Sequence, residues 1–363
     1  MHNVKQTPFL SMILLAAGMA MPALAQLEGP TIIEFDAPGA GTGAYQGTAA
    51  VQINPSGWIT GWYFTGSGSV GAYGFVRTPD GNFQSFSPPG AYYTYPQSIN
   101  PAGEVAGYSY DNAVASGFLR APGGDLITIE VPGAGTGYGQ GTFVWNINPA
   151  GEIAGTWIDG NSVSHGFLRA SSGALTTFDA PGVGAGAGQG TFMASYEGLS
   201  ADGALAGWYL DANSVSHGYF RAADGAITTF DAPGAGTGAN QGTFAYGITP
   251  VIPGVFIDAN SVMHGFVRSA GGVFTTIDIP GASGTNVQNI NLVGLIDGDY
   301  YDANGASHGF VRAPFGTIVR FDAPGAGTAS GQGTYVGANN TAGGIPGYYT
   351  DANNVYHGFL WKP

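Results

Sequence analysis

The segment from Ile147 to Gly182 reads INPAGEIAGTWIDGNSVSHGFLRASSGALTTFDAPG. It divides into four short apolar stretches, separated by an Asn-Pro-Ala-Gly turn, an Asp-Gly-Asn-Ser turn and a loop that contains Gly173. Such turn residues between short β-prone stretches are typical of tight hairpins. The fourth stretch ends at Pro181, because proline cannot continue a strand ladder and the glycine after it permits a sharp exit. The segment therefore predicts four antiparallel strands followed by a glycine-rich link.

The same pattern recurs seven times, and its clearest marker is a glycine followed by an aromatic residue. The glycines of this marker are Gly74, Gly117, Gly166, Gly218, Gly265, Gly309 and Gly358, at a mean spacing of about 47 residues. A period of roughly 40–50 residues with four strands per repeat is typical of a β-propeller blade. Solenoid repeats are shorter, and membrane barrels have longer alternating strands. The repeats predict an all-β protein, a seven-bladed β-propeller of four-stranded antiparallel blades.

The two ends of the chain carry the parts of one divided repeat. Residues 31–39 end in Pro-Gly like a fourth strand but precede every Gly-aromatic strand, whereas the chain stops directly after the seventh such strand. Pairing these two ends would complete the last blade and remove two exposed strand edges. We therefore expect a single propeller domain over residues 26–363, closed by the N-terminal strand pairing with the last blade.

Residues 1–25 have the features of a secretory signal peptide. A cationic start precedes an apolar run that begins at Phe9, and an Ala-Leu-Ala sequence that ends at Ala25 offers small residues where signal peptidase reads them. The apolar run is shorter than the ~20 residues that cross a bilayer. We expect cleavage near Ala25 and a secreted protein, extracellular or periplasmic, without membrane insertion.

Composition narrows the classes of partner and chemistry. The chain has 64 glycines and 22 prolines in 363 residues, yet 44% of its residues are hydrophobic and only 9% are charged, so it should collapse rather than stay disordered. Nine basic residues against 23 acidic ones give a formal charge of −14, which argues against nucleic acid as a partner. Because the sequence contains no cysteine, disulfides and thiolate chemistry are excluded.

The repeat resembles a family of bacterial extracellular repeats. Ile-Asn-x-x-Gly-x-Val-x-Gly, as at residues 99–107, then His-Gly-Phe-Leu, as at residues 165–168, and a strand closing on Pro-Gly are similar to the HAF-type repeat. That repeat is named for a His-Ala-Phe core, whereas here the middle residue is glycine. The resemblance covers nearly all of residues 27–363. The family is known mainly as secreted, propeller-like proteins without an established activity, so the resemblance implies location and fold.

Five repeats carry an aspartate and a histidine six positions apart. The pairs are Asp159 and His165, Asp211 and His217, Asp258 and His264, Asp302 and His308, and Asp351 and His357. The short turn between them places the carboxylate beside the imidazole across a hairpin, so we expect a structural hydrogen bond that orients each blade. Metal ligation and general-base catalysis are the alternative roles. Five copies on separate blades argue against catalysis, because an active site needs one constellation.

Arginine and glutamine also recur at fixed positions. Six arginines lie four residues after the histidine position, and acidic residues that follow the fourth strand, such as Asp179, are their expected partners. The second turn of each repeat and the long link should emerge on one rim, which would be acidic, amide-rich and interspersed with tyrosine. The link glutamines of this candidate ligand face are Gln46, Gln140, Gln189, Gln241 and Gln332. The central channel is the other place where we expect a ligand.

The sixth repeat carries a weak candidate for a calcium site. Asp297 and Asp299 replace apolar residues of the other repeats and project from one strand face, and Asp302 lies just beyond them. A divalent cation could bridge these carboxylates, although a full calcium site takes six to eight oxygens. The Asp-Ala-Asn-Ser turns supply too few oxygens and are expected to be plain turns. No other cofactor is predicted.

These observations leave two functions open. Near-identical blades without a unique catalytic cluster favour a secreted, non-catalytic binding, adhesion or scaffold protein, expected as a monomer, with a polysaccharide or a surface protein as its partner. The alternative is a propeller-type glycan hydrolase or lyase, which needs one pair of carboxylates at glycosidase separation. The non-repeated acids Glu197, Asp297 and Asp299 are the candidates for such a pair.

Overall fold

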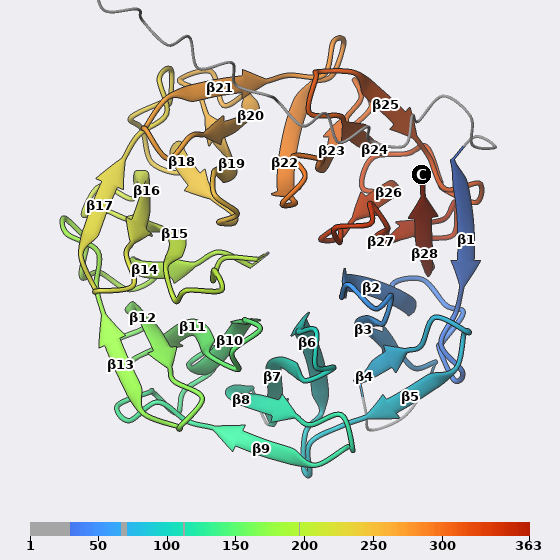
Figure 1. Ribbon diagram of the computed structural model, residues 1–363, viewed down its shortest axis with the longest axis horizontal. Coiled ribbons are helices and arrows are strands. Elements are labelled where there is room, and N and C mark those ends of the chain that lie inside the picture. Colours follow the sequence, from blue (N-terminus) through green and yellow to red (C-terminus); the bar gives the residue numbers. More distant parts are fainter. Residues whose placement is uncertain (1–29, 67–70, 112, 196) are drawn as a thin grey trace, which may run out of the picture.

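The structure, a computed structural model, describes residues 30–66, 71–111, 113–195 and 197–363. The predicted signal peptide, residues 1–25, lies outside the described residues. Every helix or strand assigned in the described part of the chain is a β-strand, and the strands are arranged around a ring (Figure 1). Over the same residues, there is no helix with the length and apolar character needed to cross a lipid bilayer. The predicted all-β class is confirmed.

Consecutive strands pair in antiparallel groups. In the first group β2 (Gly47–Ile53) pairs with β3 (Ile59–Phe64), β3 with β4 (Ala72–Arg77), and β4 with β5 (Phe83–Phe86). The same order of antiparallel pairing recurs within β6–β9, β10–β13, β14–β17, β18–β21 and β22–β25. The first strand of each group lies nearest the centre of the ring and the fourth lies at its circumference (Figure 1).

The strands of these later groups are short. Their bounds are β6 (Tyr93–Ile99), β7 (Val105–Asp111), β8 (Val114–Arg120), β9 (Leu126–Ile129), β10 (Gly141–Ile147), β11 (Ile153–Ile158), β12 (Ser164–Arg169), β13 (Leu175–Phe178), β14 (Gly190–Met193), β15 (Leu205–Leu210), β16 (Ser216–Arg221), β17 (Ile227–Phe230), β18 (Gly242–Ala245), β19 (Ile252–Ile257), β20 (Met263–Arg268), β21 (Phe274–Ile277), β22 (Gly284–Ile290), β23 (Ile296–Tyr301), β24 (Ser307–Arg312) and β25 (Ile318–Phe321).

The last group takes its outer strand from the other end of the chain. β26 (Gly333–Val336), β27 (Ile345–Thr350) and β28 (Tyr356–Lys362) pair antiparallel in order, and β1 (Thr31–Phe35) pairs antiparallel with β28 along its whole length. Figure 1 shows β1 beside β28, where the two ends of the chain meet in one sheet. The predicted closure by the N-terminal strand is confirmed.

The aromatic residue of the Gly-aromatic pair is buried in every group. These side chains are at most 2% exposed: Phe75, Phe118, Phe167, Tyr219, Phe266, Phe310 and Phe359. The glycine before the aromatic residue makes room for the outer strand. At Gly166 an added Cβ would lie 2.4 Å from the ring of Phe178, so a larger residue would force β12 and β13 apart. The repeated dipeptide thus sets both the core and the spacing of the strands.

Arginines join neighbouring groups by stacking on phenylalanines. The guanidinium of Arg221 on β16 lies 5.1 Å from the ring centre of Phe178 on β13, and that of Arg77 on β4 lies 4.5 Å from Phe35 on β1. Such contacts contribute about 0.5–2 kcal/mol each. The aspartates expected as their partners are used otherwise: every ion pair within the described residues, including that of Asp179, joins an aspartate to a histidine.

Deleting residues 27–39 should abolish cooperative unfolding. Without β1, strand β28 presents an unpaired edge, and the contacts of Phe35 with the first group are lost. Thermal unfolding followed by circular dichroism measures the effect, and a chain that lacks only residues 1–25 is the control. A truncated protein that melts in the same transition as the control would contradict the closure of the ring.

Candidate functional site

A cavity of about 280 Å³ lies at the centre of the ring, on the side of the Asn-Pro turns. Its wall includes the residue at the same turn position of each repeat: Asn54, Asn100, Asn148, Ser200, Thr249, Asn291 and Asn340. Isoleucines, leucines and prolines beside these residues make much of the remaining surface. The cavity lies in the central channel, which is one of the two places where the sequence predicts a ligand.

Each asparagine at this turn position both folds its own turn and contacts the next repeat. The side-chain oxygen of Asn54 accepts hydrogen bonds from the backbone N–H groups of Ser56 and Trp58, both at 3.0 Å. Its Nδ2 donates to the carbonyl of Asn100 at 3.0 Å. Asparagine serves both purposes because its amide carries an acceptor and two donors. This dual use accounts for the Asn-Pro-x-Gly sequence better than turn preference alone.

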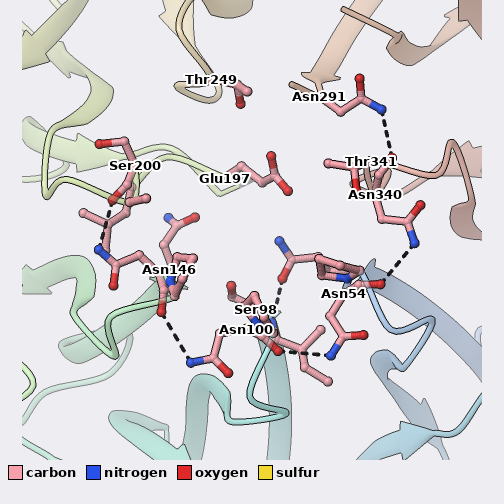
Figure 2. A pocket seen from close by; sticks show the side chains of 18 of the residues that line it. Asn54, Ser98, Asn100, Asn146, Glu197, Ser200, Thr249, Asn291, Asn340 and Thr341 are labelled. Carbon is pink, nitrogen blue, oxygen red and sulfur yellow. Dashed lines mark hydrogen bonds between the residues drawn. The ribbon is translucent and has the colours of Figure 1, made fainter. Parts of the chain in front are cut away.

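Hydrogen bonds from an asparagine Nδ2 to a backbone carbonyl of the next repeat occur around most of the cavity wall (Figure 2). The Nδ2 atoms donate, at 2.8–3.3 Å, from Asn54 to Asn100, Asn100 to Asn148, Asn148 to Ser200, Asn291 to Asn340 and Asn340 to Asn54. The series is interrupted where Ser200 and Thr249 replace asparagine. Because these asparagine amides bond to the backbone, they form the wall and leave little capacity to bind a ligand.

Glu197 belongs to an insertion at this interruption. Thr191 and Ser200 are nine positions apart, whereas the corresponding residues of the third repeat, Thr142 and Asn148, are six apart, as are those of the other repeats. The extra residues follow β14 and carry Glu197 to the cavity. Figure 2 shows its side chain at the middle of the wall, reaching toward the open centre.

The inserted segment is held in place by the preceding repeat and by the following one. Nδ2 of Asn146 donates to the carbonyl of Ala194 at 2.7 Å, and its Oδ1 accepts from the N–H of Gly198 at 2.8 Å. The carbonyl of Glu197 accepts from the N–H of Ile248 at 2.9 Å, where the asparagine series is missing. Glu197 has a φ of 40°, in the left-handed region that costs a non-glycine residue about 1–2 kcal/mol. These contacts fix the backbone from which the Glu197 side chain projects.

The carboxyl group of Glu197 is poised between two protonation states. Of the described residues that line the cavity, only Glu197 carries an ionisable side chain. This side chain is half-buried because it faces the open space of the cavity. Desolvation by the surrounding protein raises the pKa of Glu197 to about 7, and a hydrogen bond with Thr249 opposes part of that rise. Near neutral pH the group can therefore either donate or accept a hydrogen bond.

Two further acids are sealed inside the protein. Asp297 and Asp299, on β23, are 0% exposed. Asp299 accepts hydrogen bonds from Asn286, at 3.2 Å, and from Gln288, yet burial raises its pKa to about 7. Burial, with a contribution from the charge of Glu197, raises the pKa of Asp297 well above its usual value. Both side chains are therefore biased toward the neutral acid.

The three aspartates proposed as a calcium site do not come together. Asp302 lies beyond β23 in an exposed turn, where its Oδ1 accepts from the N–H groups of Asn304 and Ala306. Asp297 and Asp299 point into the interior because strand alternation places both on the buried face. Within the described residues, no group of three or more histidines and acids is placed to hold a metal ion.

The five Asp–His pairs are adjacent, but the hydrogen bond goes to a different aspartate from the one expected. Nε2 of each histidine lies 3.7–4.0 Å from the aspartate six positions earlier. Nδ1 instead bonds, at 2.8–3.1 Å, to the aspartate after the outer strand: His165 to Asp179, His217 to Asp231, His264 to Asp278, His308 to Asp322 and His357 to Asp36. Because Asp36 follows β1, the last of these bonds joins the two ends of the chain.

The first aspartate of each pair shapes its turn. Oδ1 of Asp159 accepts from the N–H groups of Asn161 and Val163, both at 2.8 Å. The imidazole of His165 stacks on Trp157, with ring centres 4.3 Å apart. The histidine is thus enclosed by an aromatic ring and two carboxylates, an arrangement that organises the rim in each of these repeats.

The link glutamines lie beside the Asp turns, on the rim expected for them, but their amides are used within the fold. Oε1 of Gln140 accepts from the N–H of Gly137 at 2.7 Å, while Nε2 donates to the carbonyl of Gly160 at 3.3 Å and to Ser162 at 3.2 Å. Equivalent bonds to the link and to the neighbouring hairpin are made by Gln46, Gln189, Gln241 and Gln332. The glutamines fasten each link to the next hairpin.

Comparison with known proteins bears on the fold. No protein-family model and no curated protein matches the sequence. A catalytically inactive virginiamycin B lyase from Staphylococcus aureus, with quinupristin, is similar over 91% of this chain and 99% of its own, at 16% identity and a TM-score of 0.52. The BP39L lectin from Burkholderia pseudomallei is similar over 87% of this chain and 96% of its own, at 11% identity and a TM-score of 0.55. The fold is a β-propeller. At these identities the likeness shows the fold alone.

Replacing Asn340 by aspartate should destabilise the propeller where its first and last repeats meet. The carboxylate keeps the oxygen that caps its own turn but cannot donate to the carbonyl of Asn54. We expect a loss of about 1–3 kcal/mol in the free energy of unfolding at pH 8. Part of the loss should return at pH 5, because a protonated carboxyl can donate. Urea denaturation at both pH values tests this, and equal stability of the variant and the natural protein at pH 8 would contradict it.

Asp299 should make the protein less stable as the pH rises toward neutrality. Its pKa is about 7 in the folded protein against an ordinary value of 3.8. Its contribution to the free energy of unfolding is therefore complete below about pH 4 and is lost as the pH passes through 7. This difference between the folded and ordinary pKa of Asp299 corresponds to a change of at most about 4 kcal/mol in the free energy of unfolding. Asp299→Asn should reduce the pH dependence of the unfolding free energy between pH 4 and 8, and the part that remains comes from the raised pKa values of Glu197 and Asp297. An undiminished slope in the variant would show that Asp299 is not the group responsible.

Proposed function

We propose that this protein is a secreted, non-catalytic binding protein that holds its ligand in the central cavity beside Glu197. The insertion in the fourth repeat is the observation that carries the proposal. A residue required only to build the ring would recur in the other repeats, as the wall asparagines do, whereas Glu197 occurs once. It also occupies a strained backbone position and faces the central cavity, features that mark functional rather than structural residues.

The proposal includes a specific form of the propeller. We assign seven four-stranded blades, of which six are consecutive groups and the seventh is completed by β1. The domain would span residues 26–363 and would be exported as a monomer after cleavage near Ala25. The resemblance of the repeats to HAF-type extracellular repeats supports this location.

The expected ligand is a terminal sugar of a polysaccharide. A cavity of about 280 Å³ takes a small group rather than a polymer backbone. Its wall combines isoleucine and proline surface with the hydroxyl of Thr249 and the carboxyl of Glu197. A sugar offers both an apolar ring face and hydroxyls that can donate to a carboxylate or accept from the acid form. The likeness of the fold to a lectin is consistent with this class of ligand.

A glycan hydrolase or lyase is the second candidate, and one observation favours it. A carboxyl with a pKa of about 7 is suited to general acid–base catalysis. Hydrolysis of a glycoside, however, commonly uses two carboxyls that face the substrate, about 5–10 Å apart. The other non-repeated acids, Asp297 and Asp299, are both fully buried, so they cannot meet a substrate in the cavity. Binding is therefore the better supported function.

Glu197→Gln tests both candidates. The amide cannot accept hydrogen bonds with the strength of a carboxylate, so we expect at least fivefold weaker binding to the glycans that the natural protein selects from an array. Incubation of the same glycans with the natural protein should release no product. Glu130→Gln, an exposed glutamate outside the cavity, is the matched control. Unchanged binding by E197Q would refute the cavity site, and product release that disappears in E197Q would establish the enzyme instead.

A further inference from the structure

A hollow of about 570 Å³ lies on the rim of the long links, between the second and third groups of strands. This rim is opposite the Asn-Pro turns that form the central cavity. Five tyrosines and four small residues line the hollow: Tyr92, Tyr93, Tyr95, Tyr110, Tyr138, Gly90, Ala91, Ala113 and Gly139. We call this site the tyrosine hollow. None of its lining residues carries a carboxylate or a basic group.

The hollow results from a shortened link. Eleven residues, 179–189, connect β13 to β14, but only six, 87–92, connect β5 to β6. In the longer link, Gln189 holds a glycine-rich loop against the neighbouring hairpin. In the second group Tyr92 stands at the position of that glutamine, and the glycine-rich loop is absent. Space that such a loop fills in most groups is here surrounded by tyrosine rings. The link between β21 and β22, residues 278–283, is equally short but carries no tyrosine.

Tyr93 takes a position that other repeats reserve for glycine. It bridges to Ala72 of the preceding group just as Gly190 bridges to Ser164. An added Cβ at Gly190 would lie 2.1 Å from the carbonyl oxygen of Ser164, so that position normally excludes side chains. At Tyr93 the neighbouring chain makes room through Gly71, where a Cβ would meet the Tyr93 ring at 1.9 Å. A tyrosine at position 93 and a glycine at position 71 together place the Tyr93 ring at the hollow.

Some of the tyrosine rings of the hollow are held by packing against other rings, and others are exposed. Tyr93 and Tyr95 are nearly parallel, at 16°, with centres 6.0 Å apart, and Tyr92 stands at 90° to Tyr93. Tyr95 also packs edge-on against Trp62, with ring centres 5.7 Å apart, which holds the Tyr95 ring in place. Tyr138 is 91% exposed and Tyr92 is 40% exposed, so packing of the fold does not require either ring.

The phenol of Tyr138 lies within electrostatic reach of two other tyrosines of the hollow. Burial raises the pKa of Tyr93, with smaller contributions from Tyr92 and Tyr138, and burial raises the pKa of Tyr110, with a contribution from Tyr138. The hollow therefore offers aromatic faces together with clustered hydroxyls that donate and accept hydrogen bonds.

We propose that the tyrosine hollow is a second binding site, which takes a neutral saccharide chain. A pyranose ring has an apolar C–H face that stacks on a tyrosine ring and hydroxyls at its edge that bond to phenol groups. The volume of the hollow is within the range of about 300–1,000 Å³ found for ligand pockets. The lack of basic lining residues and the formal charge of −14 disfavour an anionic sugar. This site stands independently of the central cavity, because the two lie on opposite faces.

Calorimetric titration with hexasaccharides tests the site. The probes are the β-1,4-linked hexamers of glucose, mannose and xylose, with the hexamer of galacturonic acid as the charged comparison. We expect at least one neutral hexamer to bind and the uronic acid hexamer not to bind. Tyr138→Ala and Tyr92→Ala should each weaken binding at least tenfold, while Tyr138→Phe, which keeps the ring, should weaken it about threefold or less.

Two control variants distinguish the tyrosine hollow from the central cavity and from exposed tyrosines elsewhere on the surface. Tyr45→Ala removes a tyrosine that is 66% exposed but does not line the hollow, and it should leave binding unchanged. Glu197→Gln and Tyr138→Ala should act independently: because the cavity is a different site, Tyr138→Ala should weaken binding by the same factor whether or not Glu197→Gln is present. Failure of all three neutral hexamers to bind, tighter binding of the uronic acid, or full binding by Tyr138→Ala would each overturn the proposal. Loss of binding in E197Q alone would place the sugar in the cavity and overturn the hollow.

Discussion

The pairing of β1 with β28 is the constraint on which the rest of the structure depends. Propeller groups bury their faces against neighbours, so an open row would leave two apolar faces and two strand edges in water. The chain has no cysteine, and the ends are held by non-covalent contacts alone. The backbone ladder of β1 and the hydrogen bond between His357 Nδ1 and the carboxylate of Asp36 join the N-terminal strand to the last group, and Arg77 of the first group stacks on Phe35. Closure of the ring also creates the cavity, because the wall includes turns from both ends of the chain.

Residues that recur in this protein build the ring, and both candidate sites lie where the repeat is broken. The asparagines, glutamines and histidines at repeated positions bond to backbone or to aspartates, so they have little capacity left for a ligand. The insertion in the fourth repeat carries Glu197 to the cavity. The short link that ends at Tyr92 is followed by Tyr93 at a position where the other repeats have glycine. Repetition supplies stability around the whole circle, which allows one or two repeats to depart from it without loss of the fold.

Much of the fold could be predicted from the sequence because the signals are local. Turn residues at fixed spacing gave the strands, and the displaced Pro-Gly strand at residues 31–39 gave the closure. Contacts between distant positions were harder. The histidine partner Asp179 lies fourteen residues away, across a further strand, so the nearer Asp159 was the natural choice for His165. Glu197 was recognised as non-repeated, but its place in the cavity could not be inferred. The spacing of nine residues between Thr191 and Ser200, against six elsewhere, is the signal that would have indicated it.

Native-state hydrogen exchange of the β1 amides tests the closure most directly. If β1 completes the ring, the ladder amides of Thr31–Phe35 that bond to β28 should exchange only through global unfolding, with the same opening free energy and denaturant dependence as those of β27. Exchange of the β1 amides through a local opening, several kcal/mol below that of β27 and insensitive to denaturant, would contradict the account.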